Sequence, residues 1–355
     1  MSRGLHVRAI SSHRADRWWS GRATEEEGEE TRMQLRVFRR RLALAVATVA
    51  MPFTPRAQSW PASPLRLVVP FGPGGSTDAM GRLLATGLQQ RLGVPVIVEN
   101  RGGAATSQGT ELAARAAPDG QTWLVTSDSF AVLPALIPTL SFDIQRDFAP
   151  ATLIASAPNV IAVHPSRPWR NLAEILAAAR SGALSYASTG NGTTGHLAMT
   201  RFAAANGVTM AHAAYRSGGP ALNDAVAGHV DMIIGSAALL APMLAADRLR
   251  PVVQLGPARL PALSQVPTSA EAGFSDFLAE TWWGVLAPAH TPAPLVARMV
   301  AEVSAVFREE RTARLITEGQ HARLRLDGPA SMQEFLARQI ATWGAVIREH
   351  RISAD

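Results

Sequence analysis

Hydrophobic and polar positions follow a strand-then-helix order along most of this chain. Short apolar runs predict buried strands, and the periodic segments between them predict amphipathic helices. In the first half, the strands are expected at 65–69, 94–98 and 122–127, and the helices at 77–90 and 108–116. This alternation is typical of an α/β fold with a parallel sheet.

The second half repeats this order. Its strands are expected at 184–188, 209–214 and 231–235, and its helices at 172–179, 194–205 and 221–227. Apolar runs at 250–255 and 282–287 and long helices at 293–307 and 331–348 complete the chain. Two α/β halves joined by crossing strands form a cleft, and clefts between domains commonly bind small ligands.

The segment LRLVVPFGPGGSTDAMGR carries an apolar strand into a glycine-rich turn and then into a helix. Gly72, Gly74 and Gly75 allow a tight turn, and Ser76 is expected to cap a helix that begins near Thr77. Free amides at such a turn and the positive end of the helix dipole can hold a carboxylate or phosphate. The segment lacks both the P-loop motif and the dinucleotide fingerprint. A plain strand-to-helix connection is the alternative.

A second loop of this kind, STGNGTTGHL, begins at Ser188 and contains Gly190, Gly192 and Gly195. Two glycine-rich helix starts, one in each half, could face each other across the cleft. Such a pair would suit a ligand with a carboxylate at one or both ends.

Residues 1–57 differ from the rest of the chain. Residues 1–32 are polar and without periodicity, whereas Met33 is followed by basic residues, the apolar run 42–50 and small residues up to Ala57. This order predicts a secretory signal peptide that starts at Met33 and is cleaved near Gln58. The apolar run is too short to span a membrane. A twin-arginine signal at Arg40 and Arg41 is an alternative to Sec export, and a disordered tail with a membrane-surface helix is a further one.

The formal net charge of +6 is concentrated at the front of the chain. Beyond residue 57 there are 23 arginines against 22 acidic residues, so the exported part is close to neutral. A near-neutral chain argues against a nucleic-acid partner. The absence of cysteine from the sequence excludes disulfides, thiolate metal sites and a cysteine nucleophile. We therefore expect a free exported protein with no metal and no cofactor.

Several segments, in order from Pro64 to the C-terminus, resemble the Bug family of periplasmic solute receptors. They are LRLVVPFGPGGSTD, VENRGGA, APDGQTWLV, STGNGTTGHL, AYRSGGPALNDAVAGHVD, VPTSAEAG and WWGVLAPAHTP. The resemblance implies an α/β, two-domain type 2 periplasmic-binding-protein (Venus-flytrap) fold with two crossing strands and a ligand cleft. We expect one domain from 58–160 and 283–355 and a second from 161–282, in a monomeric periplasmic protein. The implied partners are a small organic carboxylate and the membrane permease of a tripartite tricarboxylate transporter.

The chain departs from the family pattern near the expected pocket. The family usually has Asn-Arg-Pro-Gly-Ala-Gly-Gly, but this chain has Asn-Arg-Gly-Gly-Ala-Ala-Thr from Asn100 to Thr106. Side chains at Ala105 and Thr106 narrow any close approach to the backbone there. Thr193 and Arg216 replace a common serine and lysine.

The expected ligand-binding residues lie on both glycine loops and at the end of the 122–127 strand. They are Phe71, Gly72, Gly74, Gly75, Ser76, Thr77, Asp78, Ser127, Ser129, Thr189, Asn191, Gly192, Thr193, Thr194, His196 and Tyr215. For Asp78 the alternatives are a first-turn acid, a residue that orients the loop, or one that binds an amino group of the ligand. For Thr193 and Thr194 the alternative is helix capping, and for His196 it is capping or packing. Of Trp282 and Trp283, one is expected to face the core and the other the cleft.

Two other functions remain open on the sequence. One is a sensor subunit that binds a carboxylate and docks a membrane kinase. The other is an exported hydrolase with Ser76 or Ser188 as nucleophile and His196 as base, although the chain has no GxSxG motif.

Overall fold

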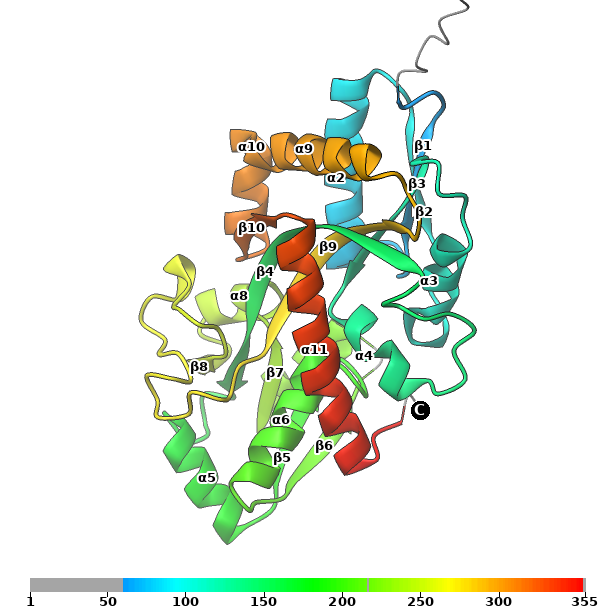
Figure 1. Cartoon of the computed structure of the whole chain (residues 1–355). Coiled ribbons are helices and arrows are strands. Elements are labelled where there is room, and N and C mark those ends of the chain that lie inside the picture. Colours follow the sequence, from blue (N-terminus) through cyan, green and yellow to red (C-terminus); the bar gives the residue numbers. More distant parts are fainter. Residues whose placement is uncertain (1–59, 216, 354–355) are drawn as a thin grey trace, which may run out of the picture. The chain divides into compact units, whose positions relative to one another are not determined.

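In a computed structural model of the chain, the structure describes residues 60–215 and 217–353. The predicted signal peptide and Arg216 lie outside these residues. The described part forms a ten-stranded mixed sheet with helices on its faces (Figure 1). Within the described residues, no helix is both long enough and apolar enough to cross a membrane.

The first half of the sheet has the strand order β2-β1-β3-β9. Strands β1, β2 and β3 are parallel, and β9 is antiparallel to β3. The strands are β1 (Leu65–Val69), β2 (Val96–Asn100), β3 (Thr122–Ser127) and β9 (Glu280–Pro288). The intervening helices are α2 (Ser76–Leu92) and α3 (Ser107–Ala114), and α4 (Ser129–Leu136) follows β3. All three parallel strands therefore point their carboxyl ends, and the loops that follow, toward the same edge.

The second half repeats this arrangement with the order β4-β7-β5-β6. Strands β5, β6 and β7 are parallel, and β4 is antiparallel to β7. The strands are β5 (Leu184–Ser188), β6 (Met210–Ala214) and β7 (Met232–Ser236). The helices are α5 (Leu172–Ser181), α6 (Thr194–Ala205), α7 (Gly218–Ala227) and α8 (Ala237–Ala245).

Strand β4 (Phe148–Val163) belongs to both halves. Its residues from Phe148 to Pro158 pair with β9, and those from Asn159 onward pair with β7 and with β8 (Arg250–Gln254). Strand β10 (Arg323–Asp327) pairs with the middle of β4. The long strand β4 and the adjacent β9 are thus the two crossing strands expected of this fold.

The remaining helices close the faces of the sheet. They are α9 (Ala293–Arg308), α10 (Glu310–Arg314), a π-helical turn (Leu315–Gly319) and α11 (Pro329–His350), together with short 3₁₀ turns at Ala104–Thr106 and Pro261–Leu263. Helix α11 lies along α4, β4 and α6 (Figure 1). It therefore packs against elements of both halves.

Trp282 and Trp283 of β9 are both buried, at 0% and 1% exposure. The Trp282 ring meets Phe335 of α11 edge-on, with centroids 5.6 Å apart, whereas Trp283 belongs to the apolar cluster formed with α2 and α9. The expectation that one tryptophan faces the cleft is wrong, because helices cover both faces of β9.

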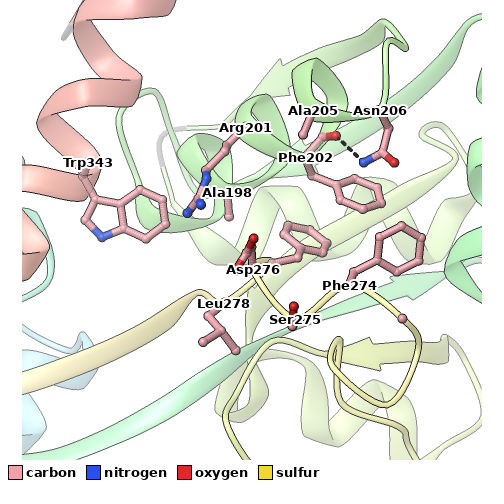
Figure 2. Close-up of a pocket in the computed structure, with 12 residues that line it drawn as sticks. Ala198, Arg201, Phe202, Ala205, Asn206, Phe274, Ser275, Asp276, Leu278 and Trp343 are labelled. Atoms are coloured by element: carbon pink, nitrogen blue, oxygen red, sulfur yellow. Dashed lines mark hydrogen bonds between the residues drawn. The ribbon is translucent and has the colours of Figure 1, made fainter.

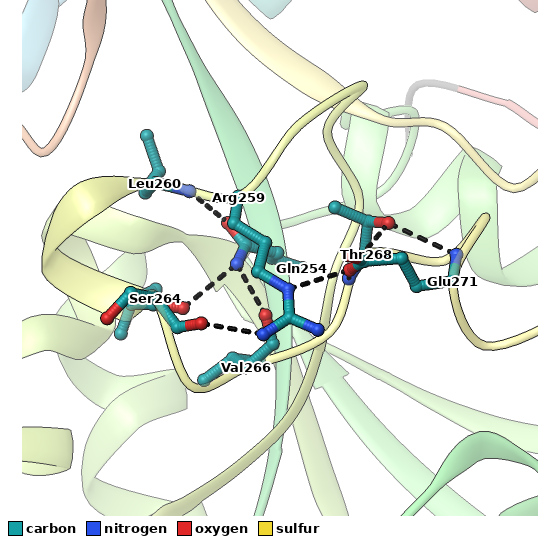
Figure 3. A network of polar contacts seen from close by, with 8 residues as sticks. Gln254, Arg259, Leu260, Ser264, Val266, Thr268 and Glu271 are labelled. Carbon is teal, nitrogen blue, oxygen red and sulfur yellow. Dashed lines mark hydrogen bonds and ion pairs between the residues drawn. The ribbon is translucent and has the colours of Figure 1, made fainter.

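The segment between β8 and β9 is held by the buried amide of Gln254. Its Nε2 donates to the carbonyls of Leu263 (3.1 Å) and Val266 (2.7 Å), and its Oε1 accepts from the Leu260 amide (2.8 Å) (Figure 3). Nearby, the Arg259 guanidinium and Thr268 hold the pKa of Glu271 at about 2. These bonds fix the path by which the chain returns from β8 to the crossing strand β9.

Candidate ligand-binding site

Loops from both halves meet beside the carboxyl ends of β1, β2, β3 and β5. A Cβ atom built on Gly102 would lie 3.2 Å from the amide nitrogen of Gly72, so the loops after β1 and β2 touch. A Cβ built on Gly192 would lie 2.5 Å from Cδ1 of Leu136, so α4 packs directly on the loop after β5. The structure therefore brings the two predicted glycine loops and the end of β3 to one region.

The first glycine loop is held in place by Asp78. The Asp78 carboxylate accepts hydrogen bonds from the Gly74 amide (2.8 Å), from Nε of Arg82 (2.9 Å) and from Nδ2 of Asn100 (2.9 Å). Burial acts to raise the pKa of Asp78, but these hydrogen bonds outweigh it and hold the pKa below its usual range. Asp78 therefore orients the loop, which is one of the roles expected for it.

Helix α2 begins at Ser76 with Gly75 as its N-cap, and no side chain caps it. The expected Ser76 cap is therefore wrong. Within the described residues, the amides of Ser76 and Thr77 have no acceptor, as expected for the first turn of a helix. Gly72, Gly74, Gly75 and Ser76 are exposed, whereas Thr77 is buried and Phe71 half-buried. This loop can present backbone donors to an anion.

The loop after β2 carries a feature that the sequence did not assign to the site. Four successive residues have left-handed or positive φ: Gly103 (129°), Ala104 (44°), Ala105 (51°) and Thr106 (78°). Positive φ favours glycine, so the alanine and threonine at 105 and 106 adopt a strained backbone. The sequence signal was the replacement of two family glycines.

Three buried hydroxyls close to this loop have no hydrogen-bond partner among the described residues. They belong to Thr106, Thr126 and Ser129, and α4, which begins at Ser129, contacts the 3₁₀ turn that contains Thr106. Buried hydroxyls usually find a partner. Ser129 was among the expected site residues; Thr106 and Thr126 were not.

The hydrogen-bonding groups of the second glycine loop are largely bonded to one another and to the first turn of α6. Thr193 is the N-cap of α6: its hydroxyl accepts from the His196 amide (3.5 Å) and donates to the Gly190 carbonyl (2.8 Å). The Gly192 amide donates to Nδ1 of His196 (3.1 Å). This loop has fewer free donors than the sequence led us to expect.

His196 is buried in a stack of rings. Its ring lies 3.9 Å from that of His212, which in turn stacks on Tyr186 at 4.9 Å. Burial, together with the neighbouring His212, lowers the pKa of His196 to about 4, and burial also lowers the pKa of His212. Both rings are therefore neutral at physiological pH, and neither supplies a cation to an acidic ligand.

The residues of the hydrolase alternative do not form a catalytic pair. Oγ of Ser188 lies 2.7 Å from Nε2 of His212 rather than against His196, and Ser188 is fully buried. Nδ1 of His196 is already engaged by the Gly192 amide. For the exposed Ser76, no base is in contact within the described residues.

The other expected residues are spread around the site. The Tyr215 hydroxyl donates to Asp224 (2.6 Å), and burial and this carboxylate raise the pKa of Tyr215 to about 12. Ser127 is buried at the end of β3. Thr189 is half-buried and Asn191 exposed on the loop after β5.

Asp128, which follows β3, reaches the first residue of α6. Its carboxylate accepts a short hydrogen bond from the Thr194 hydroxyl and further bonds from the Thr194 amide and the Ser127 hydroxyl. Burial raises the pKa of Asp128, against the opposing effect of these bonds. This contact joins the first half to the N-terminus of a second-half helix, and sequence reasoning missed its geometry.

A separate pocket of about 310 Å³ lies on the second half, between α6, residues 273–278 and Trp343 of α11 (Figure 2). None of the expected site residues lines it. The aromatic residues that line this pocket pack against one another. The Phe202 ring stacks on Phe277 at 4.2 Å and meets Phe274 edge-on at 5.3 Å. We place the candidate site at the glycine loops, because the first of them presents backbone donors without acceptors at the carboxyl end of a strand.

The chain belongs to the tripartite tricarboxylate transporter family of receptors (TctC), whose pattern matches residues 80–352. A similar relative is the UPF0065 protein in the tcbD-tcbE intergenic region of Pseudomonas sp. strain P51, which is 34% identical over 323 residues, or 89% of this chain and 96% of that protein. Protein BugT of Bordetella pertussis is 31% identical over 86% of this chain and 94% of its own length. The Bug resemblance read from the sequence is thereby confirmed.

Solved structures agree with this assignment. R. palustris Rpa4515, determined with adipate, is 30% identical and superposes with a TM-score of 0.73 over 83% of this chain and 99% of that chain. The α/β periplasmic-binding-protein fold predicted from the sequence is therefore confirmed, and the chain is a member of a family of periplasmic solute-binding receptors.

Proposed function

We propose that the protein is an extracytoplasmic receptor that binds a small organic carboxylate between its two domains and delivers it to a tripartite tricarboxylate membrane permease. The observation that carries the proposal is the first glycine loop, where the Ser76 and Thr77 amides have no acceptor among the described residues at the start of α2. Such amides and the helix dipole favour a carboxylate. The adipate in Rpa4515 adds support from a relative.

In this proposal the protein holds its ligand and performs no chemistry. The loop amides bind the carboxylate, and we assign the buried, unpartnered hydroxyls of Thr106 and Ser129 to polar groups of the bound ligand. The proposed domains are 58–160 with 283–355 and 161–282. The proposed boundary at residue 160 lies close to the point where β4 changes partner, at Pro158 and Asn159.

Export to the periplasm and a monomeric state belong to the same proposal. A sensor subunit would bind the same ligand and differ only in its membrane partner. Co-purification with permease subunits or with a kinase distinguishes these two roles.

The chain offers a clean test of the amide mechanism at Ser76. Ser76 is the first helical residue, where proline is well tolerated, so Ser76→Pro removes one amide hydrogen without breaking α2. Ser76→Ala is the matched control, because it removes the side chain and keeps the amide. A hydrogen bond to a charged group contributes about 1.5 to 3 kcal/mol, so Ser76→Pro should weaken binding roughly 10- to 100-fold.

Isothermal titration with a panel of aliphatic and aromatic acids, adipate included, measures these affinities. Equal affinities for Ser76→Pro and Ser76→Ala would overturn the amide mechanism. If no acid binds the wild-type protein while an ester is hydrolysed, the receptor role itself is wrong.

A further inference from the structure

The N-terminus of α6 is the place where the second glycine loop would hold a second ligand carboxylate. In the structure the protein's own Asp128 lies there. The Asp128 carboxylate accepts from both the hydroxyl and the amide of Thr194, and it is also bonded to the Ser127 hydroxyl. It is half-buried, so it is part of the wall of this region rather than of the solvent-exposed surface.

Three further amides of this loop are also bonded within the protein. The Gly192 amide is bonded to His196, and the amide of His196 is bonded to the Thr193 hydroxyl. The amide of Thr193 donates to the Gly190 carbonyl at 3.4 Å. A second ligand carboxylate bound at Thr194 would therefore have to displace Asp128.

Among the described residues, none of the groups in contact with Asp128 is a cation. The nearest titratable rings, His196 and His212, remain neutral because they are buried. Arg82, on α2, is paired with Asp78. Two carboxyl groups at one helix terminus compete for the same donors and, when both are ionised, repel each other.

We propose that Asp128 determines ligand specificity: it occupies the α6 donors with the protein's own carboxyl group and restricts the cleft to acids with a single carboxylate. This inference rests on the proposed receptor function and narrows its ligand class. The carboxylate of such a ligand binds at the first loop, and its far end, near α6, carries no second acid.

The test compares acids of equal length that differ by one carboxylate. Hexanoate and adipate, butyrate and succinate, and 4-methylbenzoate and terephthalate form three matched pairs for isothermal titration. The wild-type protein should bind the monoacid of the best pair at least tenfold more tightly than the diacid. A diacid bound more tightly than its monoacid by the wild-type protein would overturn the inference without any variant.

Two variants identify Asp128 as the cause. Asp128→Ser vacates the Thr194 donors, whereas Asp128→Asn keeps an acceptor and removes the charge. The preference for the monoacid should fall at least tenfold in Asp128→Ser; a fall in Asp128→Asn as well would attribute the preference to charge as well as to occupied donors. Asp247→Asn, at an exposed position, makes the same charge change and should leave the preference unaltered.

An unchanged preference in both Asp128 variants, with acids still bound, would overturn the inference and leave the receptor function standing. Failure of all six acids to bind any form, together with no binding across the wider panel, would overturn the receptor function instead. The two failures are thus distinguishable.

Discussion

His196 shows how burial of one residue sets a property of the folded protein. The pKa of His196 is about 4 in the folded state, against about 6.5 for an exposed histidine. Between these pH values the unfolded chain takes up a proton that the folded protein does not. The free energy of unfolding therefore keeps its full value above about pH 6.5 and falls as the pH decreases toward 4. His212, whose pKa is also lowered, acts in the same direction.

We expect the free energy of unfolding to decrease by roughly 3 kcal/mol between pH 7.5 and pH 4.5, from the size of the His196 shift. Urea denaturation at several pH values measures it. In His196→Asn the Oδ1 atom can accept from the Gly192 amide as Nδ1 does, so this variant should lose much of the pH dependence. The exposed His290→Asn is the control. Equal pH dependence in wild type and His196→Asn would contradict the prediction.

At the scale of single residues, the sequence identified the loops better than the contacts within them. The role of Asp78 in orienting its loop was foreseeable, because Asp78 lies one turn from the glycines that it holds. The contact between Asp128 and Thr194 was not, because it joins positions 66 residues apart. Ser76 failed as a cap because Gly75 takes that position with no side-chain bond.

Among the elements, the strands and helices bounded by turn-forming or capping residues were predicted best. The strands Thr122–Ser127 and Leu184–Ser188 and the helix Thr194–Ala205 have the predicted bounds. The long strand β4 was missed, because it is buried almost throughout, lacks alternation, and contains Pro150 and Pro158. Helices α4 and α8 were missed because each is short, apolar and interrupted by a proline.

Replacing glycine by alanine is expected to have opposite effects on stability at two helical positions. A Cβ on Gly87 of α2 would lie 2.5 and 2.6 Å from the methyl groups of Val306 on α9, so Gly87→Ala should force these helices apart and destabilise by about 1 to 3 kcal/mol. A Cβ on Gly344 of α11 would lie 3.1 Å from the movable end of Arg348 and at an ordinary contact distance of 3.9 Å from the Cβ of Ala135. Gly344→Ala should therefore be neutral or stabilising by up to about 1 kcal/mol.

Thermal and urea denaturation of both variants measure these effects. The two substitutions change helix propensity in the same direction, so the difference between them reports the contact between α2 and α9. If Gly87→Ala is as stable as Gly344→Ala, that contact is looser than the structure has it.

For the molecule as a whole, the periodicity of the sequence was sufficient to predict two α/β halves, and the ordered motifs identified the receptor family. Neither could reveal that one strand, β4, pairs with strands of both halves. Strands that pair across a long stretch of chain leave no local signal in the sequence. The same reason explains why two similar glycine loops proved unequal. One presents free amides, whereas in the other the Thr194 amide is taken by Asp128 and the Gly192 amide by His196.

The exported form should begin at or near Gln58, and Trp60 supplies a structural reason for a cleavage site upstream of it. The Trp60 indole donates to the Gly120 carbonyl (2.9 Å), and its ring meets Trp123 edge-on at 6.3 Å. Cleavage after Trp60 would remove this anchor from the first half, so we expect the mature chain to retain it. Intact-mass measurement of protein recovered from the periplasm identifies the terminus directly. Recovery of an uncleaved chain that starts at Met1 would contradict both the signal peptide and the proposed periplasmic location.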